Sequence, residues 1–216
     1  MVSKFKPLRI GDLSARVPIV QGGMGVGISL AGLAAAVANA GGIGVIASAG
    51  IGMAEPDFFT NFAEANLRAL RTEIRKARAA TQGVLGLNIM VALSNFADLV
   101  RTAIEEKIDI IFSGAGLPLN MPQYRDAGTH TKLVPIVSSG RAAALLCKRW
   151  GARFDYLPDA LVVEGPLAGG HLGFAIEQIA DPAFALERLV PEVIEAARPF
   201  AEAAGRPIPI IAAGGI

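Results

Sequence analysis

The residues best suited to chemistry lie in one glycine-rich segment, residues 162–174, which reads VVEGPLAGGHLGF. Glu164 ends a short apolar run, and His171 comes directly after two glycines. An imidazole titrates near neutral pH, so His171 can exchange a proton with a substrate. The flanking glycines would let the ring approach a flat ligand without steric interference. A loop histidine with no chemical role is the alternative, and the spacing alone leaves both interpretations open.

A second glycine-rich segment, PIVQGGMGVGIS at residues 18–29, lies between one apolar run that predicts a strand and another that predicts a helix. A dinucleotide-binding turn needs the spacing G-x-G-x-x-G and an acidic residue about 20 positions later. No three of these glycines have that spacing, and the next apolar run is followed by Ser48 and Ala49. The sequence therefore disfavours a dinucleotide fold, although glycines still let backbone amides come close to a ligand.

Short apolar runs alternate with longer helical patterns along the chain. Each run is apolar on successive residues, as expected for parallel strands that are buried on both faces. The predicted strands are 17–20, 43–47, 84–89, 108–112, 133–137, 161–163 and 208–212. The predicted helices are 30–40, 58–80, 96–106, 141–150 and 182–204, and a loop with a short helix is expected over 113–129.

Polar residues and glycines recur where the predicted strands end. They include Gln21, Asn88, Ser113, Ser138, Glu164 and Gly214. In a barrel of parallel strands all of these positions converge on one mouth, whereas an open sheet gathers only those near its switch point. We therefore predict an α/β fold, a (β/α)8 TIM barrel, of which this sequence supplies about seven strands.

The sequence stops at AAGGI, directly after the seventh predicted strand. A chain that ended there would leave an unpaired sheet edge, which is a liability for a protein in solution. We therefore expect residues 1–216 to form one barrel domain that is incomplete at its C-terminus, without the eighth strand and the helices that follow. The phosphate site of such barrels commonly uses the loops after strands seven and eight, so Gly214 and Gly215 would form one half of it.

Composition excludes several classes of protein. The 20 basic and 19 acidic residues leave no basic excess for nucleic acid. Residues 17–54 carry no charge, but glycines and Asn39 divide this stretch into pieces too short to span a membrane. The single cysteine, Cys147, cannot form an internal disulfide and is expected to be a packing residue on the apolar face of a helix. Trp150, at the end of that helix, is expected to pack against the barrel. With no signal peptide and no metal-ligand spacing, we predict a cytoplasmic protein without a metal.

Six motifs follow one another along the chain in the order QGGMG, LNIMV, GAGLP, PIVSSG, EGPLAGGHLGF and AAGGI. Together they resemble the nitronate monooxygenase family, formerly called 2-nitropropane dioxygenases, which also includes the flavin-dependent enoyl-acyl-carrier-protein reductases. The AGGH motif is the most specific part of a resemblance that spans most of the chain. It implies an FMN-binding TIM barrel, in which the first glycine turn would lie along the flavin ring.

The resemblance also implies which residues hold the cofactor. Those beside the isoalloxazine would be Gly22, Gly23, Met24, Gly169 and Gly170. Those at the ring edge or along the ribityl chain would be Asn88, Ser138 or Ser139, and Glu164. Gly214 and Gly215 would lie at the phosphate, and His171 matches the catalytic histidine of the family.

The activity implied by the resemblance is oxidation of an alkyl nitronate or nitroalkane by FMN and O2. His171 would be the base that removes the proton α to the nitro group. Two other activities of the same scaffold stay open: NAD(P)H-dependent reduction of an enoyl thioester, with His171 as proton donor, and NAD(P)H-dependent reduction of quinones. A flavin-binding barrel without turnover is a further alternative. The expected partners are a small-molecule substrate and O2, and assembly into a homo-oligomer is left open.

Two features depart from the family pattern. Many members have proline at the position of Gly23, so the QGGMG turn is expected to be more flexible than theirs. The closing strand that completes the phosphate site is absent from the sequence.

Overall fold

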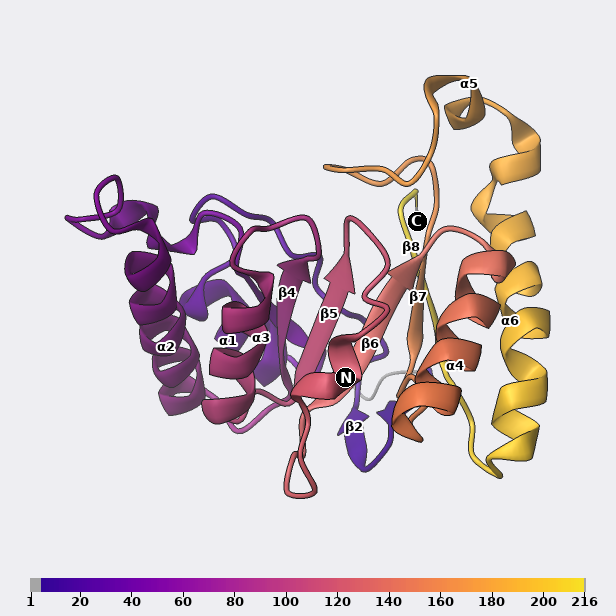
Figure 1. The fold of residues 1–216 in the computed structure, drawn as a ribbon, viewed down its shortest axis with the longest axis horizontal. Helices are drawn as coiled ribbons and strands as arrows, with labels where there is room; N and C mark the ends of the chain where they lie inside the picture. Colours follow the sequence, from indigo (N-terminus) through magenta and orange to yellow (C-terminus); the bar gives the residue numbers. More distant parts are fainter. Residues whose placement is uncertain (1–4, 216) are drawn as a thin grey trace. The chain divides into compact units, whose positions relative to one another are not determined.

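A computed structural model describes residues 5–215 of the chain (Figure 1). The chain forms two compact units. The first unit comprises Met1–Phe112 and Tyr124–Lys132, and the second unit comprises Ser113–Gln123 and Leu133–Ile216. A single domain over residues 1–216 stays a prediction.

The first unit begins with an antiparallel hairpin and continues with alternating strands and helices. Its elements are β1 (Leu8–Ile10), β2 (Leu13–Ala15), α1 (Ala31–Asn39), β3 (Gly44–Ala47), the 3-10 helix η1 (Ile51–Ala54), α2 (Phe62–Ala80), β4 (Leu85–Met90), α3 (Phe96–Glu105) and the start of β5 (Ile110–Gly114). Strands β3 and β4 are parallel, and Ala47 at the end of β3 lies opposite Asn88. The hairpin turns at Gly11, whose φ of 59° is left-handed.

The strand predicted over residues 17–20 is present only as one parallel bridge between Val20 and Ile43. Two hydrogen bonds flank this bridge, from the Gln21 N–H to the Ile43 carbonyl at 3.0 Å and from the Ile43 N–H to the Ile19 carbonyl at 2.9 Å. The segment therefore runs beside β3 without forming a full strand, so the strand prediction is confirmed only at the bridge.

The second unit contains the end of β5 and the remaining parallel strands. Its other elements are η2 (Met121–Tyr124, which reaches the boundary between the units), β6 (Lys132–Val137), α4 (Gly140–Phe154), β7 (Leu161–Glu164), α5 (Ile176–Ile179), η3 (Pro182–Phe184), α6 (Leu186–Ala203) and β8 (Ile210–Ala213). Strand β7 pairs in parallel with β6 and with β8. Helices α4 and α6 lie side by side in this unit (Figure 1).

The six longer strands follow the order β3-β4-β5-β6-β7-β8. Each strand therefore neighbours the one before it and the one after it, as in a (β/α)8 barrel, whereas a doubly wound sheet reverses its order at a switch point. The α/β fold is confirmed, and the strand order agrees with part of a TIM barrel. The short helix expected within 113–129 is η2, and the helix predicted over 182–204 is divided into η3 and α6.

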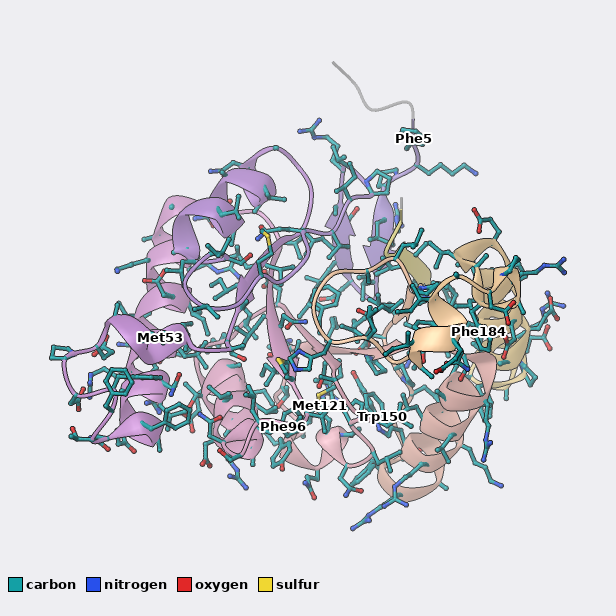
Figure 2. The ribbon with its side chains drawn as sticks, turned by 90° about the horizontal axis from the view of Figure 1, so that it is seen from above. Phe5, Met53, Phe96, Met121, Trp150 and Phe184 are labelled. Atoms are coloured by element: carbon teal, nitrogen blue, oxygen red, sulfur yellow. The ribbon has the colours of Figure 1, made fainter. Side chains whose placement is uncertain are left out.

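The core of each unit consists of the apolar strands and the inward faces of the helices. All four residues of β3 are buried. On α4, Cys147 and Trp150 are fully buried, as predicted, and Trp150 is labelled in Figure 2. His130, in the loop before β6, is exposed. Among residues 5–215, no helix combines the length and the apolar composition needed to cross a membrane.

Two aspartates hold the amino ends of parallel strands. In the first unit, Asp109 Oδ2 accepts hydrogen bonds from the Leu85 N–H at 2.8 Å and from Arg78 Nη2 at 2.7 Å. In the second unit, Asp159 Oδ2 accepts one from the Leu133 N–H at 2.8 Å and another from the Tyr156 hydroxyl. Each carboxylate comes just before one strand and binds the start of the preceding one, so it fixes how neighbouring strands begin.

Candidate functional site

The first glycine turn is held at its base and exposed at its tip. Gln21 Nε2 donates to the Val45 carbonyl at 2.9 Å and to Ser29 Oγ at 3.0 Å, while the Val45 N–H donates to Gln21 Oε1 at 3.2 Å. The Met24 N–H also donates to the buried Ser29 Oγ at 3.0 Å. Gly22 is exposed, and Met24 keeps 47% of its surface accessible. Gln21 and Ser29, neither of which was predicted to hold a ligand, fix the turn to β3.

Gly23 and Asn88 lie against each other in the first unit. A Cβ placed on Gly23 would come within 2.5 Å of Asn88 Cβ and 2.9 Å of its Cγ. As long as Asn88 keeps this position, residue 23 has to be glycine. This contact gives a physical reason why the chain has glycine where many family members have proline. Gly22, by contrast, has open space where its Cβ would be.

The carboxyl ends of β3 and β4 carry polar side chains without partners. Ser48 is buried, and its Oγ has no hydrogen bond with any described residue. Its N–H donates to the Asn88 carbonyl at 3.0 Å, which ties the two strands together. The half-buried Asn88 side chain itself makes no hydrogen bond within the part of the chain that the structure describes. An amide and a hydroxyl are thus available to a ligand.

In the second unit the segment after β6 contains two serines with different surroundings. Ser139 caps α4, since its Oγ accepts a hydrogen bond from the Ala142 N–H at 3.3 Å. The Gly140 N–H donates to Glu192 Oε1 at 2.8 Å, so a carboxylate already occupies this helix terminus. Ser138 is not engaged in the cap, and a Cβ on Gly173 would lie 2.9 Å from its Oγ. Of the two candidates, Ser138 is the one free to bind a cofactor.

Glu164 ends β7 as a half-buried carboxyl group. It makes no ion pair or side-chain hydrogen bond with any residue from 5 to 215. Burial raises the pKa of Glu164 above its ordinary value, because removal from water disfavours the charged form. Ser113 on β5, also in this unit, is fully buried with an unpartnered Oγ. Unpartnered polar groups at strand ends are thus found in both units.

The loop after β7 exposes the predicted catalytic histidine. Gly169, Gly170 and His171 are all exposed, and Gly170 has a φ of 88°. No atom lies within 4 Å of a Cβ placed on Gly169 or Gly170. His171 forms no hydrogen bond or ion pair within the described residues. Its imidazole is accessible, and nothing in its own unit fixes its orientation.

Gly214 and Gly215 follow β8 with φ values of 86° and 88°. A Cβ on Gly214 would lie 2.7 Å from Ala168 Cβ, and one on Gly215 would lie 2.9 Å from Leu167 Cβ. The loop that carries His171 therefore begins by packing on this glycine pair. Glu164 and His171 form no hydrogen bond or ion pair with each other in the part of the chain that the structure describes.

A pocket of about 170 Å³ adjoins the glycine pair. Its lining comes from the loop after β7, the segment around η3 and the start of α6: Pro166, Leu167, Ile179, Ala180, Asp181, Pro182, Ala185, Leu186, Glu187, Gly214 and Gly215. None of these residues is a lysine or an arginine, so an anion there would depend on backbone N–H groups. Asp181 is already committed, because its Oδ1 accepts a hydrogen bond from the Ala183 N–H at 2.8 Å.

Two curated relatives resemble the chain over most of its length. Both are named (3aS,4S,5R,7aS)-5-hydroxy-7a-methyl-1-oxo-octahydro-1H-indene-4-carboxyl-CoA dehydrogenase. The relative from Mycobacterium tuberculosis is 31% identical over 199 residues, which cover 92% of this chain and 45% of the relative. The relative from Rhodococcus jostii is 28% identical over 199 residues, covering 92% of this chain and 44% of the relative. The chain thus spans less than half the length of these proteins.

Among solved structures, FabK from Thermotoga maritima is similar with a TM-score of 0.65 and 32% identity, over 92% of this chain and 51% of that protein. A nitroalkane oxidase from Streptomyces ansochromogenes has a TM-score of 0.68 at 22% identity, over 93% of this chain and 59% of that protein, and supports the fold. Residues 7–216 match the family described as "Nitronate monooxygenase". The chain therefore belongs to the nitronate monooxygenase family.

Proposed function

We propose that this chain is the FMN-binding part of a flavin-dependent oxidoreductase. The observation that carries the proposal is the set of polar side chains at the carboxyl ends of the strands without partners in the described residues, namely Ser48, Asn88, Ser113, Ser138 and Glu164. Buried polar groups are normally hydrogen-bonded, so the buried Ser48 in the first unit and the buried Ser113 in the second each support a ligand that supplies the missing partner. The half-buried Asn88, Ser138 and Glu164 add hydrogen-bonding groups beside them. Because the chain belongs to the nitronate monooxygenase family, FMN is the ligand that we propose.

The residues present fit FMN in each unit. Gly22, Gly23 and Met24 offer an exposed turn with bare backbone, suited to a flat ring, and Asn88 can hydrogen-bond to the ring edge. In the second unit, Ser138 and Glu164 match the hydroxyl groups of the ribityl chain. Their hydrogen-bonding groups complement alcohols, and a carboxylate that accepts hydrogen bonds from alcohols is stabilised in its charged form.

The phosphate would lie at Gly214 and Gly215. Successive glycines with left-handed φ can turn their N–H groups toward an anion. The carboxylates nearby, Asp181 and Glu187, disfavour a phosphate on the pocket side. We therefore place the phosphate on the backbone of the glycine pair, with further donors from the part of the family barrel that lies outside this sequence.

His171 would move the substrate proton. Bound FMN supplies an electron acceptor that can pass electrons to O2 or receive them from NAD(P)H. For a nitroalkane, His171 in its neutral form would take the proton α to the nitro group, and the exposed, unpartnered imidazole is free to do so. Alkyl nitronates and nitroalkanes, with O2 as the electron acceptor, are the substrates we propose first, because the matched family is described by that activity.

A thioester substrate is the second candidate. It is favoured by the two curated relatives, both of which are named as dehydrogenases of a carboxyl-CoA compound. On such a substrate His171 would exchange a proton at a carbon next to a carbonyl, a similar proton transfer. Reduction of an enoyl thioester or a quinone with NAD(P)H would use the same residues.

An anaerobic absorbance titration of the purified full-length protein tests the proposal. Loss of the visible flavin absorbance on adding propionate 3-nitronate, and not on adding NADPH, would support nitronate oxidation. Rapid loss with NADPH alone would assign the protein to the NAD(P)H-dependent reductases. A protein that carries no flavin and does not bind added FMN would overturn the proposal altogether.

A further inference from the structure

The cations of α2 and α4 differ in how they are neutralised. Five basic side chains of α2 lie within ion-pair distance of carboxylates: Arg68, Arg71, Arg75, Lys76 and Arg78. Helix α4 carries Arg141, Lys148, Arg149 and Arg153 and has no acidic residue of its own. None of these four forms an ion pair within residues 5–215. Helix α4 therefore presents positive charge that the described chain leaves uncompensated.

Two of these cations converge on one neutral oxygen. Arg149 Nη2 donates to Asn120 Oδ1 at 3.1 Å, and Arg153 Nη1 donates to the same atom at 3.3 Å. A carbonyl oxygen has two lone pairs and can accept both hydrogen bonds, but it cannot neutralise two positive charges. Like charges four residues apart on a helix repel each other. In addition, Arg149 Nε is buried without an acceptor among the described residues.

The position of Asn120 is fixed by its surroundings. Trp150, which is fully buried on α4, donates from its indole Nε1 to the Pro118 carbonyl at 3.1 Å. Met121, next to Asn120, is also buried, and both Met121 and Trp150 are labelled in Figure 2. The loop that carries Asn120 is thereby anchored to the helix that carries the two arginines. Their convergence is built into the packing.

We propose that Arg149 and Arg153, next to Asn120, form a binding site for a phosphate group, free or as a monoester. A phosphate carries about 1.5 to 2 negative charges at neutral pH, which suits two guanidinium groups, and its oxygens suit their planar donors. The site is distinct from the one proposed for FMN. Arg149 lies nine residues beyond Gly140 along α4, a distance of about 14 Å along the helix axis.

Titration with inorganic phosphate, and separately with AMP, tests this site. The full-length protein would be used as isolated, without added FMN, because FMN is itself a phosphate monoester. The ionic strength would be held constant with chloride, and binding would be followed by isothermal calorimetry. Arg149→Met or Arg153→Met is expected to weaken binding about tenfold or more, because each removes hydrogen bonds to a charged group. Lys148→Met is the matched control, since it removes a cation of the same helix that has no contact with Asn120, and should bind as wild type.

Asn120→Asp gives a second test that does not depend on removing an arginine. It places a carboxylate between the two guanidinium groups, so we expect phosphate binding to be lost while the melting temperature rises and flavin absorbance is unchanged. Binding of phosphate but not AMP would assign the site to the free anion, and binding of both would assign it to monoesters as well. The absence of saturable binding, or equal affinity in wild type and both arginine variants, would overturn the proposal. Because these variants localise the site, the result is independent of whether FMN binds.

Discussion

The two ends of β7 carry carboxyl groups with opposite surroundings. Asp159, just before the strand, accepts hydrogen bonds from the Leu133 N–H and the Tyr156 hydroxyl. Glu164, at the other end, is half-buried and unpartnered in the described chain, and burial raises its pKa. A carboxylate that accepts hydrogen bonds from its own chain stabilises the fold. A carboxyl group that has no such hydrogen bonds is available to a ligand. We therefore interpret the amino end of β7 as structural and propose that its carboxyl end is functional.

The first unit repeats this contrast. Asp109 precedes β5 and is satisfied by Leu85 and Arg78, while Asn88 and Ser48 at the carboxyl ends keep side-chain groups without partners. In barrels of this kind, conserved chemistry lies at the carboxyl ends of the strands and stability at the amino ends. Within each unit, a hydrogen-bonded aspartate lies at the amino ends and polar side chains without partners among the described residues lie at the carboxyl ends, as this rule predicts.

If chemistry lies at the carboxyl ends of the strands and stability at the amino ends, the largest expected effect is on turnover, and it distinguishes the two histidines. His171 follows the carboxyl end of β7, and His130 precedes the amino end of β6. We expect His171→Ala to lower turnover by about 10²–10⁴-fold, the usual contribution of a positioned acid or base. His130→Ala should leave turnover unchanged. Steady-state rates with a nitronate and with NADPH, at matched flavin content, measure both.

Flavin absorbance distinguishes a lost proton transfer from a lost cofactor. His171→Ala should retain its flavin, because the proposed contacts to FMN come from other residues. If both alanine variants kept full activity, His171 would have no catalytic role and the flavin-binding barrel without turnover would become the better description.

The next largest effect is on stability, and it concerns Asp159 at the amino ends of β6 and β7. Asp159→Ala removes the acceptor of the Leu133 N–H and the Tyr156 hydroxyl, so two donors lose a charged partner. We expect the free energy of unfolding to fall by about 2–3 kcal/mol, with no change in flavin affinity. Chemical denaturation and a flavin titration measure the two quantities. A variant with native stability and weakened flavin binding would reverse the roles of the two ends.

A smaller effect is expected at the first glycine turn. Gly23→Ala would place a methyl group 2.5 Å from Asn88 Cβ, so one of the two must move. We expect a loss of about 1–2 kcal/mol in stability together with weaker flavin binding. Gly22→Ala is the matched control for stability in the flavin-free protein, because the space around its Cβ is open. Equal behaviour of the two variants would show that the turn accommodates the methyl group without disturbing Asn88.

Much of the fold could be predicted because its signals are local. Continuous apolar runs marked the parallel strands, and helical periodicity marked the longer helices. The hairpin β1–β2 and helix α5 were not predicted, since three-residue strands and a four-residue helix are too short to show a period. The strand expected at 17–20 is a single bridge, because an apolar composition alone does not ensure a full ladder.

The sequence predicts candidate site residues but not the contacts that surround them. Glycines and polar residues after the strands pointed to Gly23, Ser138 and Glu164. That Gly23 must be glycine depends on contact with Asn88, 65 positions away, and that Ser139 rather than Ser138 caps α4 depends on the start of the helix. The lack of any partner for Glu164 is a property of packing, which no spacing in the sequence reveals.

The smallest and most specific effect concerns Glu164 itself. Its folded-state pKa is raised, so the folded chain holds this proton more tightly than the unfolded chain does. Below about pH 4 the group is protonated in both states and costs nothing. As the pH rises, the unfolded chain loses the proton first. Stability is then lost to the buried charge, and the loss is complete above the raised pKa.

Glu164→Gln avoids that loss of stability, so the flavin-free variant should melt about 2 °C above wild type at neutral pH, with no difference near pH 4. Glu202→Gln, at an exposed position of α6, should melt like wild type at both pH values. With FMN bound the order should reverse, because the carboxylate then has hydroxyl donors that stabilise its charge. A flavin-free Glu164→Gln protein that melted below wild type would mean that Glu164 has a partner in the full-length chain, and the contrast with Asp159 would no longer separate function from stability.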